Sequence, residues 1–415
     1  MTFIFVFLPC LLLIYYISNK KYRNVILFVA SLLFYAWGEP KYVVLMLISI
    51  IINYFLALAI DKFEGRKSIR KKFLIFSILF NLLFLFFFKY IGFLIQNING
   101  LFNINIKSPS LALPIGISFY TFQILSYVVD VYKKDVKVQK NLITLGTYVS
   151  LFPQLIAGPI VRYSTIEEQL KNRKTTFSKF VSGIKRFIVG LGKKVIIANN
   201  MALIADTLFD HALVTEFSWI TILVALLAYT FQIYFDFSGY SDMAIGLGRM
   251  FGFEFLENFN YPYISCSITD FWRRWHMSLS TWFRDYVYIP LGGNRCSKLR
   301  WIFNTLVVWL FTGLWHGANW NYIIWGLYFF VILILEKLLA SKLLNKLPKF
   351  MRWIYSFVLI NIGWLIFRIE NIDILVKLIK NLFTLKKGNL INDIANNYYL
   401  SVSYTHLRAH ETGRN

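Results

Sequence analysis

Two histidines, His276 and His316, lie in one stretch, residues 269–326, among tryptophans and apolar segments. A neutral imidazole is the side chain best suited to accept a proton near pH 7, and a site sheltered from bulk water favours that neutral form. His316 therefore fits a general base. A lone buried histidine is more often a hydrogen-bonded packing residue, so spacing alone does not decide between the two roles.

Composition indicates where these histidines act. Of the 415 residues, 57% are hydrophobic and 16% are charged, which predicts a polytopic membrane protein rather than a soluble core. The net charge of +23 comes from Lys and Arg in short runs between apolar segments, so it is a topology signal and not a nucleic-acid footprint. The three cysteines are scattered, so neither a disulfide framework nor a metal site is expected.

Apolar runs long enough to approach or cross a bilayer follow one another along the chain. Basic loops at residues 19–23, 61–72 and 133–140 mark the inner side, and the polar loop 96–110 is expected outside. The expected membrane segments are residues 2–17, 25–37, 42–60, 73–95, 111–131, 217–235, 320–335 and 354–367. Residues 374–385 are too short to span alone.

Two apolar segments do not fit the alternation of inner and outer loops. Residues 142–161 carry Pro153, Gly158 and Pro159 and are followed by another basic segment, which a full crossing would place outside. We expect a broken or re-entrant element there, tolerated where protein or a water-filled cavity covers its freed backbone groups. The stretch 187–209, interrupted by glycines and lysines at 190–194, is expected to be of the same kind. Together they imply a cavity.

Residues 236–253 place Asp236, Asp242 and Arg249 among four glycines. Charges in such an apolar setting need partners or water. An Asp–Arg structural pair near a helix end is preferred over a direct part in the chemistry.

The two central histidines are expected on opposite sides of the membrane. If Lys298 and Arg300 mark the inner interface, His316 lies roughly 24 Å further along a helix, in the outer half of a core of about 30 Å. The bend at 313–317 is then the outer tip of a hairpin. His276 belongs to the inner side, among several arginines.

The chain resembles the membrane-bound O-acyltransferases, in the branch of the alginate O-acetyltransferase membrane subunit. The resemblance rests on three long motifs, FDFSGYSDMAIGLGRMFGF, ENFNYPYISCSITDFWRRWHMSLSTWFRDYVYIPLGGNR and LWHGANWNYIIWG. It implies an all-α polytopic shell with re-entrant helices around a central tunnel. It also implies that His316 is catalytic and that His276 is a second tunnel-lining residue on the cytoplasmic side.

The implied donor is an acyl thioester, acetyl-CoA or an acyl carrier, used as substrate; no bound cofactor and no metal are expected. Arginines near His276, among them Arg273, Arg274 and Arg284, are candidates for holding phosphates of that donor. Trp315, Asn319 and Asp285 are candidates for orienting the imidazole or lining the tunnel, although for Asp285 a scaffold role paired with an arginine is preferred.

The resemblance further implies a bacterial cytoplasmic membrane, a polysaccharide acceptor and a separate extracytoplasmic SGNH-type transferase as partner. Three alternatives stay open: D-alanyl transfer to teichoic acid, a non-catalytic subunit of a polysaccharide export machine, and a transporter. A transporter usually shows an internal repeat, and none is found here.

The polar residues 401–415 break the pattern before them and are expected to be a non-native tail, so His406 and His410 are excluded from chemistry. Residues 1–400 are then one transmembrane domain, expected to lack its last helices.

Overall fold

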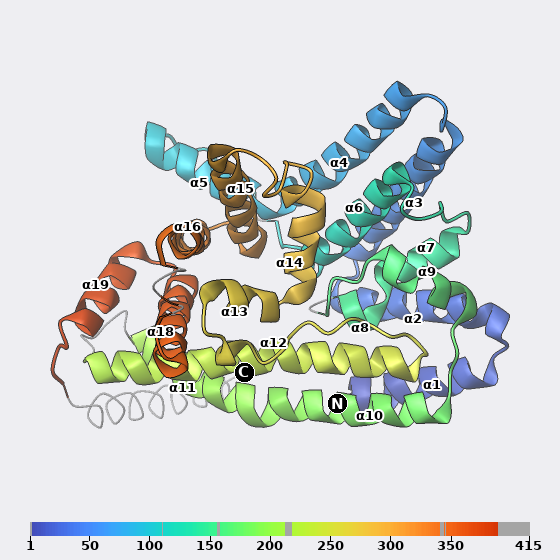
Figure 1. Ribbon diagram of the computed structural model, residues 1–415. Helices are drawn as coiled ribbons and strands as arrows, with labels where there is room; N and C mark the ends of the chain where they lie inside the picture. The colour runs from blue at the N-terminus through green and yellow to red at the C-terminus, as the bar shows by residue number, and fades with distance from the viewer. Residues whose placement is uncertain are drawn as a thin grey trace. The chain divides into compact units, whose positions relative to one another are not determined.

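The computed structural model describes residues 2–109, 111–155, 158–211, 218–340, 344 and 346–388. These residues are predominantly helical, and no strand occurs among them (Figure 1). The predicted all-α polytopic class is confirmed. The predicted tail, residues 401–415 with His406 and His410, lies outside the described residues.

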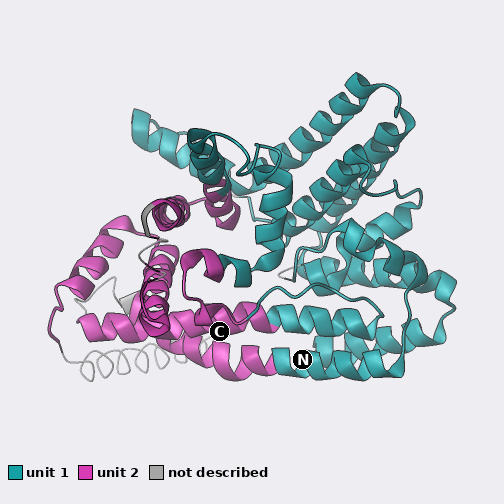
Figure 2. Ribbon diagram, viewed as in Figure 1, with its two compact units in different colours: residues 1–190, 240–260, 272–308 teal, residues 191–239, 261–271, 309–415 magenta. Residues whose placement is uncertain are grey.

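The chain divides into two compact units, coloured separately in Figure 2. The first comprises residues 1–190, 240–260 and 272–308, and the second comprises residues 191–239, 261–271 and 309–415. His276 therefore belongs to the first unit and His316 to the second.

The helices follow in chain order. The first ten are α1 Leu8–Ile17, α2 Arg23–Gly38, α3 Tyr42–Lys62, α4 Lys67–Lys89, α5 Ile91–Phe102, α6 Ile117–Lys133, α7 Leu142–Ser150, α8 Phe152–Leu155, α9 Tyr163–Asn172 and α10 Phe177–Gly192. The later ones are α11 Asn199–His211, α12 Trp219–Met250, α13 Ile268–Arg274, α14 Met277–Phe283, α15 Lys298–His316, α16 Trp320–Leu335, α18 Lys349–Arg368 and α19 Ile372–Phe383.

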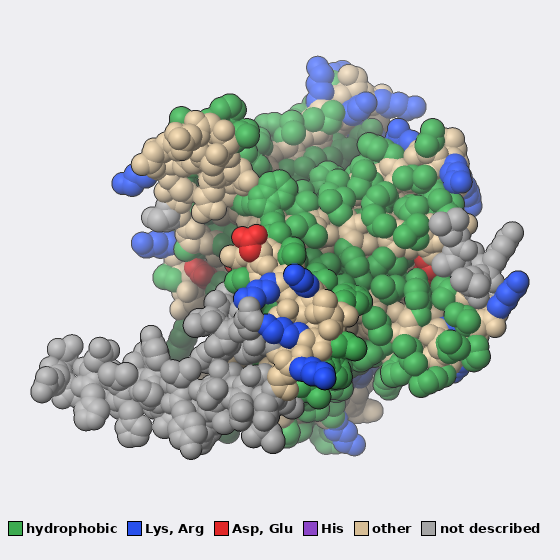
Figure 3. Space-filling model, turned by 90° about the vertical axis from the view of Figure 1, so that its left-hand side faces the viewer, with side chains coloured by type: hydrophobic (Ala, Val, Ile, Leu, Met, Phe, Trp, Pro, Cys, Tyr) green, Lys and Arg blue, Asp and Glu red, His purple; other side chains and the backbone are tan. Residues whose placement is uncertain are grey.

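Six helices in the described part of the chain are long and apolar enough to cross a membrane, and this confirms a multi-pass membrane protein. They are Tyr42–Lys62, Lys67–Lys89, Phe177–Phe209, Trp219–Met250, Trp320–Leu338 and Lys349–Arg368. Hydrophobic side chains spread over much of the face in Figure 3, as expected of a surface that contacts lipid tails.

The predicted span 73–95 differs from the structure. Helix α4 starts earlier and ends at Lys89, and the separate helix α5 takes up the first part of the expected external loop 96–110. The next predicted span, 111–131, begins as a helix only at Ile117. Pro114 and Gly116 explain the late start, because Gly116 adopts a φ of 75°, which an L side chain rarely tolerates.

The predicted break in residues 142–161 is confirmed. Helix α7 ends at Ser150, and the short α8 follows with Phe152, Gln154 and Leu155 all buried. The backbone N–H of Phe152 donates to the Ser31 hydroxyl at 3.1 Å, so protein satisfies a group that the break releases.

The predicted break at 190–194 is wrong. Helices α10 and α11 join through a π-helical segment, Lys193–Ala198, because the glycines there keep helical dihedrals and a wider turn absorbs the irregularity. Likewise α12 does not end near Phe235 but continues to Met250. Its Gly246 packs against the backbone of Gly183 on α10, a close approach that only glycines allow.

The charges in residues 236–253 are paired, although Asp242 and Arg249 do not pair with each other. In the first unit, Arg186 bridges Asp242 and Glu257 at 2.6 Å each, and Arg249 lies 3.2 Å from Glu254. In the second unit, Asp236 pairs with Lys194 at 2.7 Å. The predicted structural role is thus supported with different partners, since α10 lies against α12 and supplies Arg186.

Candidate active site

His316 ends helix α15 and is surrounded by aromatic rings of the second unit. Its imidazole lies 5.0 Å from the rings of Trp315, Trp325 and Phe367, measured between centroids, at interplanar angles of 80–84°. The ring of Tyr322 lies at 6.5 Å. Three nearly perpendicular rings restrict the rotation of the imidazole, while His316 itself remains partly exposed. The imidazole is thus restricted in orientation and keeps part of its surface exposed.

The hairpin of α15 and α16 holds this cage together. Gly313 packs against the backbone carbonyl of Tyr322, and Gly326 packs against the carbonyl of Trp309. A side chain at either glycine would collide with the partner helix, so the two backbones approach as closely as helices can. The predicted hairpin is present, but the bend expected at residues 313–317 lies later, at 317–319, because α15 stays helical to His316 and α16 begins at Trp320.

Phe367 reaches the imidazole from the end of α18, and Asn321 holds it there. The Asn321 side-chain amide is buried and donates to the backbone carbonyl of Phe367 at 2.8 Å. Sequence reasoning missed Asn321, Tyr322 and Phe367. Asn321 could have been recognised from the sequence, because it is a polar residue near the start of the apolar helix α16. Nothing in the sequence links Phe367 to His316.

Trp315 and Asn319 were both candidates for positioning His316. Trp315 is buried, and its ring centre lies 5.0 Å from that of the imidazole. Asn319 precedes α16, and its side chain makes no capping hydrogen bond there. Among the described residues, the contacts that restrict the imidazole of His316 come from aromatic rings, and none from Asn319 is seen.

His276 is 2% exposed and sits in the first unit between α13 and α14. Its φ of 45° is left-handed, an uncommon conformation for a residue other than glycine. Asn258 stabilises it: the amide oxygen of Asn258 accepts from the Ser278 N–H at 3.2 Å and from the Ser278 hydroxyl at 2.9 Å.

The same oxygen of Asn258 lies 3.2 Å from Nδ1 of His276. Because this oxygen is already an acceptor, the network assigns the proton of a neutral imidazole to Nδ1 and its lone pair to Nε2. His276 is therefore held in one orientation and one tautomer by a residue that the sequence analysis did not single out.

The arginines around His276 fall into two groups. Arg273 is exposed, and Arg274 donates to the carbonyl of Asn260 at 3.3 Å. Arg284 instead pairs with Asp285 at 2.6 Å, and Asp285 also accepts from Arg162 at 2.7 Å. Asp285 thus has the scaffold geometry that was preferred for it, with Arg162 as an additional partner.

Electrostatics at Asp285 agree with a structural role. Burial opposes the ionisation of this carboxyl, but hydrogen bonds from Arg284 and Arg162 outweigh it and hold the pKa of Asp285 below its ordinary value. The Arg162 guanidinium also lies 5.2 Å from the Tyr286 ring centre, and the Tyr286 hydroxyl donates to Asp130 at 2.8 Å. This network ties α14 and the turn after it to α6.

Residues 133–372, a segment that contains both histidines, match the profile of the membrane-bound O-acyltransferase family. The chain belongs to this family. Membrane-bound O-acyltransferases similar to it include the probable alginate O-acetylase AlgI of Azotobacter vinelandii, 44% identical over 92% of this chain and 77% of that protein. The peptidoglycan O-acetyltransferase of Helicobacter pylori is 38% identical over 94% of this chain and 80% of its own length.

A third relative, the teichoic acid D-alanyltransferase of Bacillus subtilis, is 34% identical over 53% of this chain and 58% of its own length. The membrane-bound O-acyltransferase described here is thus an enzyme that transfers acyl groups to oxygen, and it is a multi-pass membrane protein.

Proposed function

We propose that this O-acyltransferase moves an acetyl group from a cytoplasmic thioester, acetyl-CoA or an acyl carrier, for the O-acetylation of a polysaccharide outside the cell. Its place is the cytoplasmic membrane of a bacterium. The observation that carries the proposal is the partly exposed imidazole of His316, held by three nearly perpendicular rings at the end of α15.

His316 acts as the general base. Its imidazole takes the proton of the acceptor hydroxyl while the hydroxyl oxygen attacks the thioester carbonyl. The C–S bond then breaks, the new C–O bond is complete, and the imidazolium returns its proton to the leaving thiolate. The surrounding rings hold the imidazole in the orientation that this transfer needs.

Arg273 and Arg274 hold phosphates of the donor on the cytoplasmic side, next to His276. Their guanidinium groups suit bidentate contact with phosphate, and the side chain of Arg273 is exposed. Arg284 and Asp285 serve as scaffold, because they neutralise each other and Arg162 adds a second contact.

An acetyl group is preferred over D-alanine. The alginate O-acetylase of Azotobacter vinelandii and the peptidoglycan O-acetyltransferase of Helicobacter pylori match 92% and 94% of this chain, whereas the D-alanyltransferase of Bacillus subtilis matches 53%. Acetyl transfer and D-alanyl transfer would use the same general base and the same thioester chemistry. Only the identity of the acyl donor distinguishes them.

A separate extracytoplasmic SGNH-type transferase receives the acyl group and passes it to the polysaccharide. Trp320 lies next to the His316 bend and is 48% exposed, which gives such a partner an aromatic contact at the membrane surface.

The test is acyl transfer in proteoliposomes that contain this protein and the extracytoplasmic domain of a partner. Labelled acetyl-CoA, acetyl carrier protein and D-alanyl carrier protein are offered in parallel. The proposal is supported if label is transferred from an acetyl donor and this transfer is lost in His316→Ala. If label is transferred from the D-alanyl carrier protein alone, the enzyme is a D-alanyltransferase instead. Equal polysaccharide acetylation without the partner would refute the relay.

A further inference from the structure

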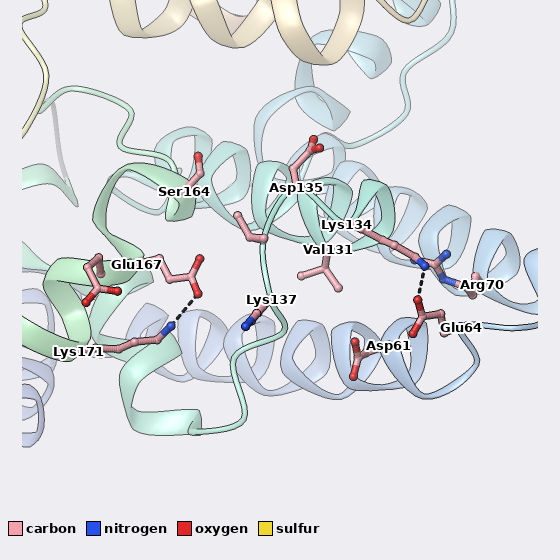
Figure 4. Close-up of a pocket in the computed structure, with 12 residues that line it drawn as sticks. Asp61, Glu64, Arg70, Val131, Lys134, Asp135, Lys137, Ser164, Glu167 and Lys171 are labelled. Carbon is pink, nitrogen blue, oxygen red and sulfur yellow. Dashed lines mark hydrogen bonds and ion pairs between the residues drawn. The ribbon is translucent and has the colours of Figure 1, made fainter.

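Among the described residues of the first unit, a pair of cavities lined by charged side chains differ in charge balance. One, of about 770 Å³, lies between the α3–α4 turn, the end of α6 and α9 (Figure 4). Figure 4 shows two of its three lysines paired within the cavity: Lys134 with Glu64, and Lys171 with Glu167 at 2.8 Å. Acidic and basic side chains compensate each other there, so this cavity needs no counter-ion.

The second cavity, of about 650 Å³, has no such compensation, and we call it the arginine pocket. None of its lining residues is Asp or Glu. Its cations are Lys20, Lys21, Arg23, Lys171, Arg173 and Lys174. Only Lys171 has a carboxylate partner among the described residues.

Two arginines that line the arginine pocket lie over the ring of Tyr15. The guanidinium carbon of Arg23 lies 4.7 Å from the ring centre and that of Arg173 lies 5.5 Å from it. Arg23 is only 8% exposed. Two like charges are thus gathered on a single aromatic ring.

Every hydrogen bond that these two arginines make within the described residues goes to a neutral oxygen. Arg23 donates to the Thr175 hydroxyl at 3.1 Å; Arg173 donates to the Tyr15 hydroxyl at 2.7 Å and to Asn24 at 2.6 Å. Nε of Arg23 and Nη2 of Arg173 are buried and have no hydrogen-bond partner in the described structure.

Removing a cation from water costs several kcal/mol, whereas a cation–π contact returns only about 0.5–2 kcal/mol. Besides Tyr15, Arg23 lies 5.8 Å from the ring centre of Tyr16 and Arg173 lies 4.8 Å from that of Phe253. These rings and the oxygens are all neutral, so they leave the pair of charges undercompensated. An anion with several oxygens satisfies the remaining N–H groups and offsets the repulsion between the guanidinium groups. Phosphoryl oxygens match the planar N–H fork of arginine best.

We propose that the arginine pocket binds a phosphoryl group, supplied by the headgroup of an anionic phospholipid or by a soluble phosphate compound. Lys20 and Lys21 follow two residues after the apolar helix Phe3–Ile17, and lysines at the end of an apolar helix favour the headgroup region of an anionic membrane. It shares no residue with the reacting or donor-binding groups proposed above, and the inference stands independently of that function.

The test removes charge without disturbing the buried pair. Lys20, Lys21 and Lys174 are exposed, and the variant K20Q/K21Q/K174Q keeps the packing of Arg23 and Arg173 on Tyr15. The matched control is K67Q/K71Q/K72Q, which removes three exposed lysines from α4 that do not line the pocket. Native mass spectrometry and thermal unfolding then compare binding of phosphatidylglycerol with that of phosphatidylcholine in nanodiscs, and of inorganic phosphate in neutral detergent.

We expect the pocket variant to lose on the order of 100-fold in affinity, since each of the three lysines near a phosphate contributes about a factor of five. Preference for phosphatidylglycerol that the control retains identifies a lipid headgroup; protection by inorganic phosphate without a lipid preference identifies a soluble phosphate. If the control loses as much as the pocket variant, or if neither probe binds the wild type, the pocket is not a phosphoryl site.

Discussion

Asn321 and Phe367 are joined by a hydrogen bond of 2.8 Å, from the side-chain amide at the start of α16 to the backbone carbonyl at the end of α18. This bond fixes the ring of Phe367 beside the imidazole of His316, with 5.0 Å between centroids. Asn321 thus holds in place one wall of the aromatic cage around His316.

Replacing His316 with Ala or Gln should reduce acyl transfer by at least about 100-fold, because no other side chain in the aromatic cage can accept the proton. Expression and thermal stability should stay near the wild type, because His316 is partly exposed at the end of α15. Transfer of label in proteoliposomes measures the loss. A variant that is inactive because it fails to fold would instead assign His316 a packing role.

Replacing Asn321 with Ala should lower kcat several-fold and leave the KM for the donor unchanged. The carbonyl of Phe367 loses its buried donor, so the ring is free to move away from the imidazole while the donor site is untouched. Asn371→Ala, which removes a cap from the exposed start of α19, is the matched control for loss of an amide. A rise in KM with normal kcat would contradict the positioning role.

Local patterns in the sequence predicted those parts of the fold that local chemistry determines. The bounds of α16 agree with the predicted span 320–335, and the break around Pro153 was predicted from the proline and the charge distribution. The continuous helix through residues 190–194 was not predicted. Glycine permits a break there, but it also permits the π-helical segment that is observed.

The site shows the same limit. His316, Trp315 and the glycine-rich bend stand together in the sequence, so their association could be predicted. Phe367 could not, because its contact with His316 depends on how α18 packs against α16. Asn258 could not be predicted for the same reason. It lies 18 positions before His276 in the sequence and contacts it because the segment after α12 folds back beside that histidine.

Replacing Asp285 with Asn should destabilise the protein by about 1 kcal/mol at pH 7, because the carboxylate anchors Arg162 and Arg284. The folded pKa of Asp285 is lowered, so its stabilising effect is complete above the ordinary pKa of about 4 and disappears as the pH falls through the folded value. The difference between wild type and variant in thermal unfolding should therefore shrink below about pH 4. Asp373→Asn on exposed α19 is the control, and an equal loss there at every pH would argue against a specific network.

Replacing Gly313 or Gly326 with Ala should destabilise the α15–α16 hairpin by about 1–3 kcal/mol, because the new methyl group meets a backbone carbonyl of the opposite helix. The carbonyls belong to Tyr322 and Trp309, and a backbone cannot move aside as a flexible side chain can. Gly192→Ala is the matched control: no atom lies within 4 Å of the added carbon and the residue is helical, so alanine should be neutral or stabilising by up to about 1 kcal/mol. Thermal unfolding in detergent compares the three variants, with acyl transfer measured on the folded fraction. Wild-type stability in both hairpin variants would mean that the two helices do not pack at glycine distance, and the orientation assigned to His316 would lose its support.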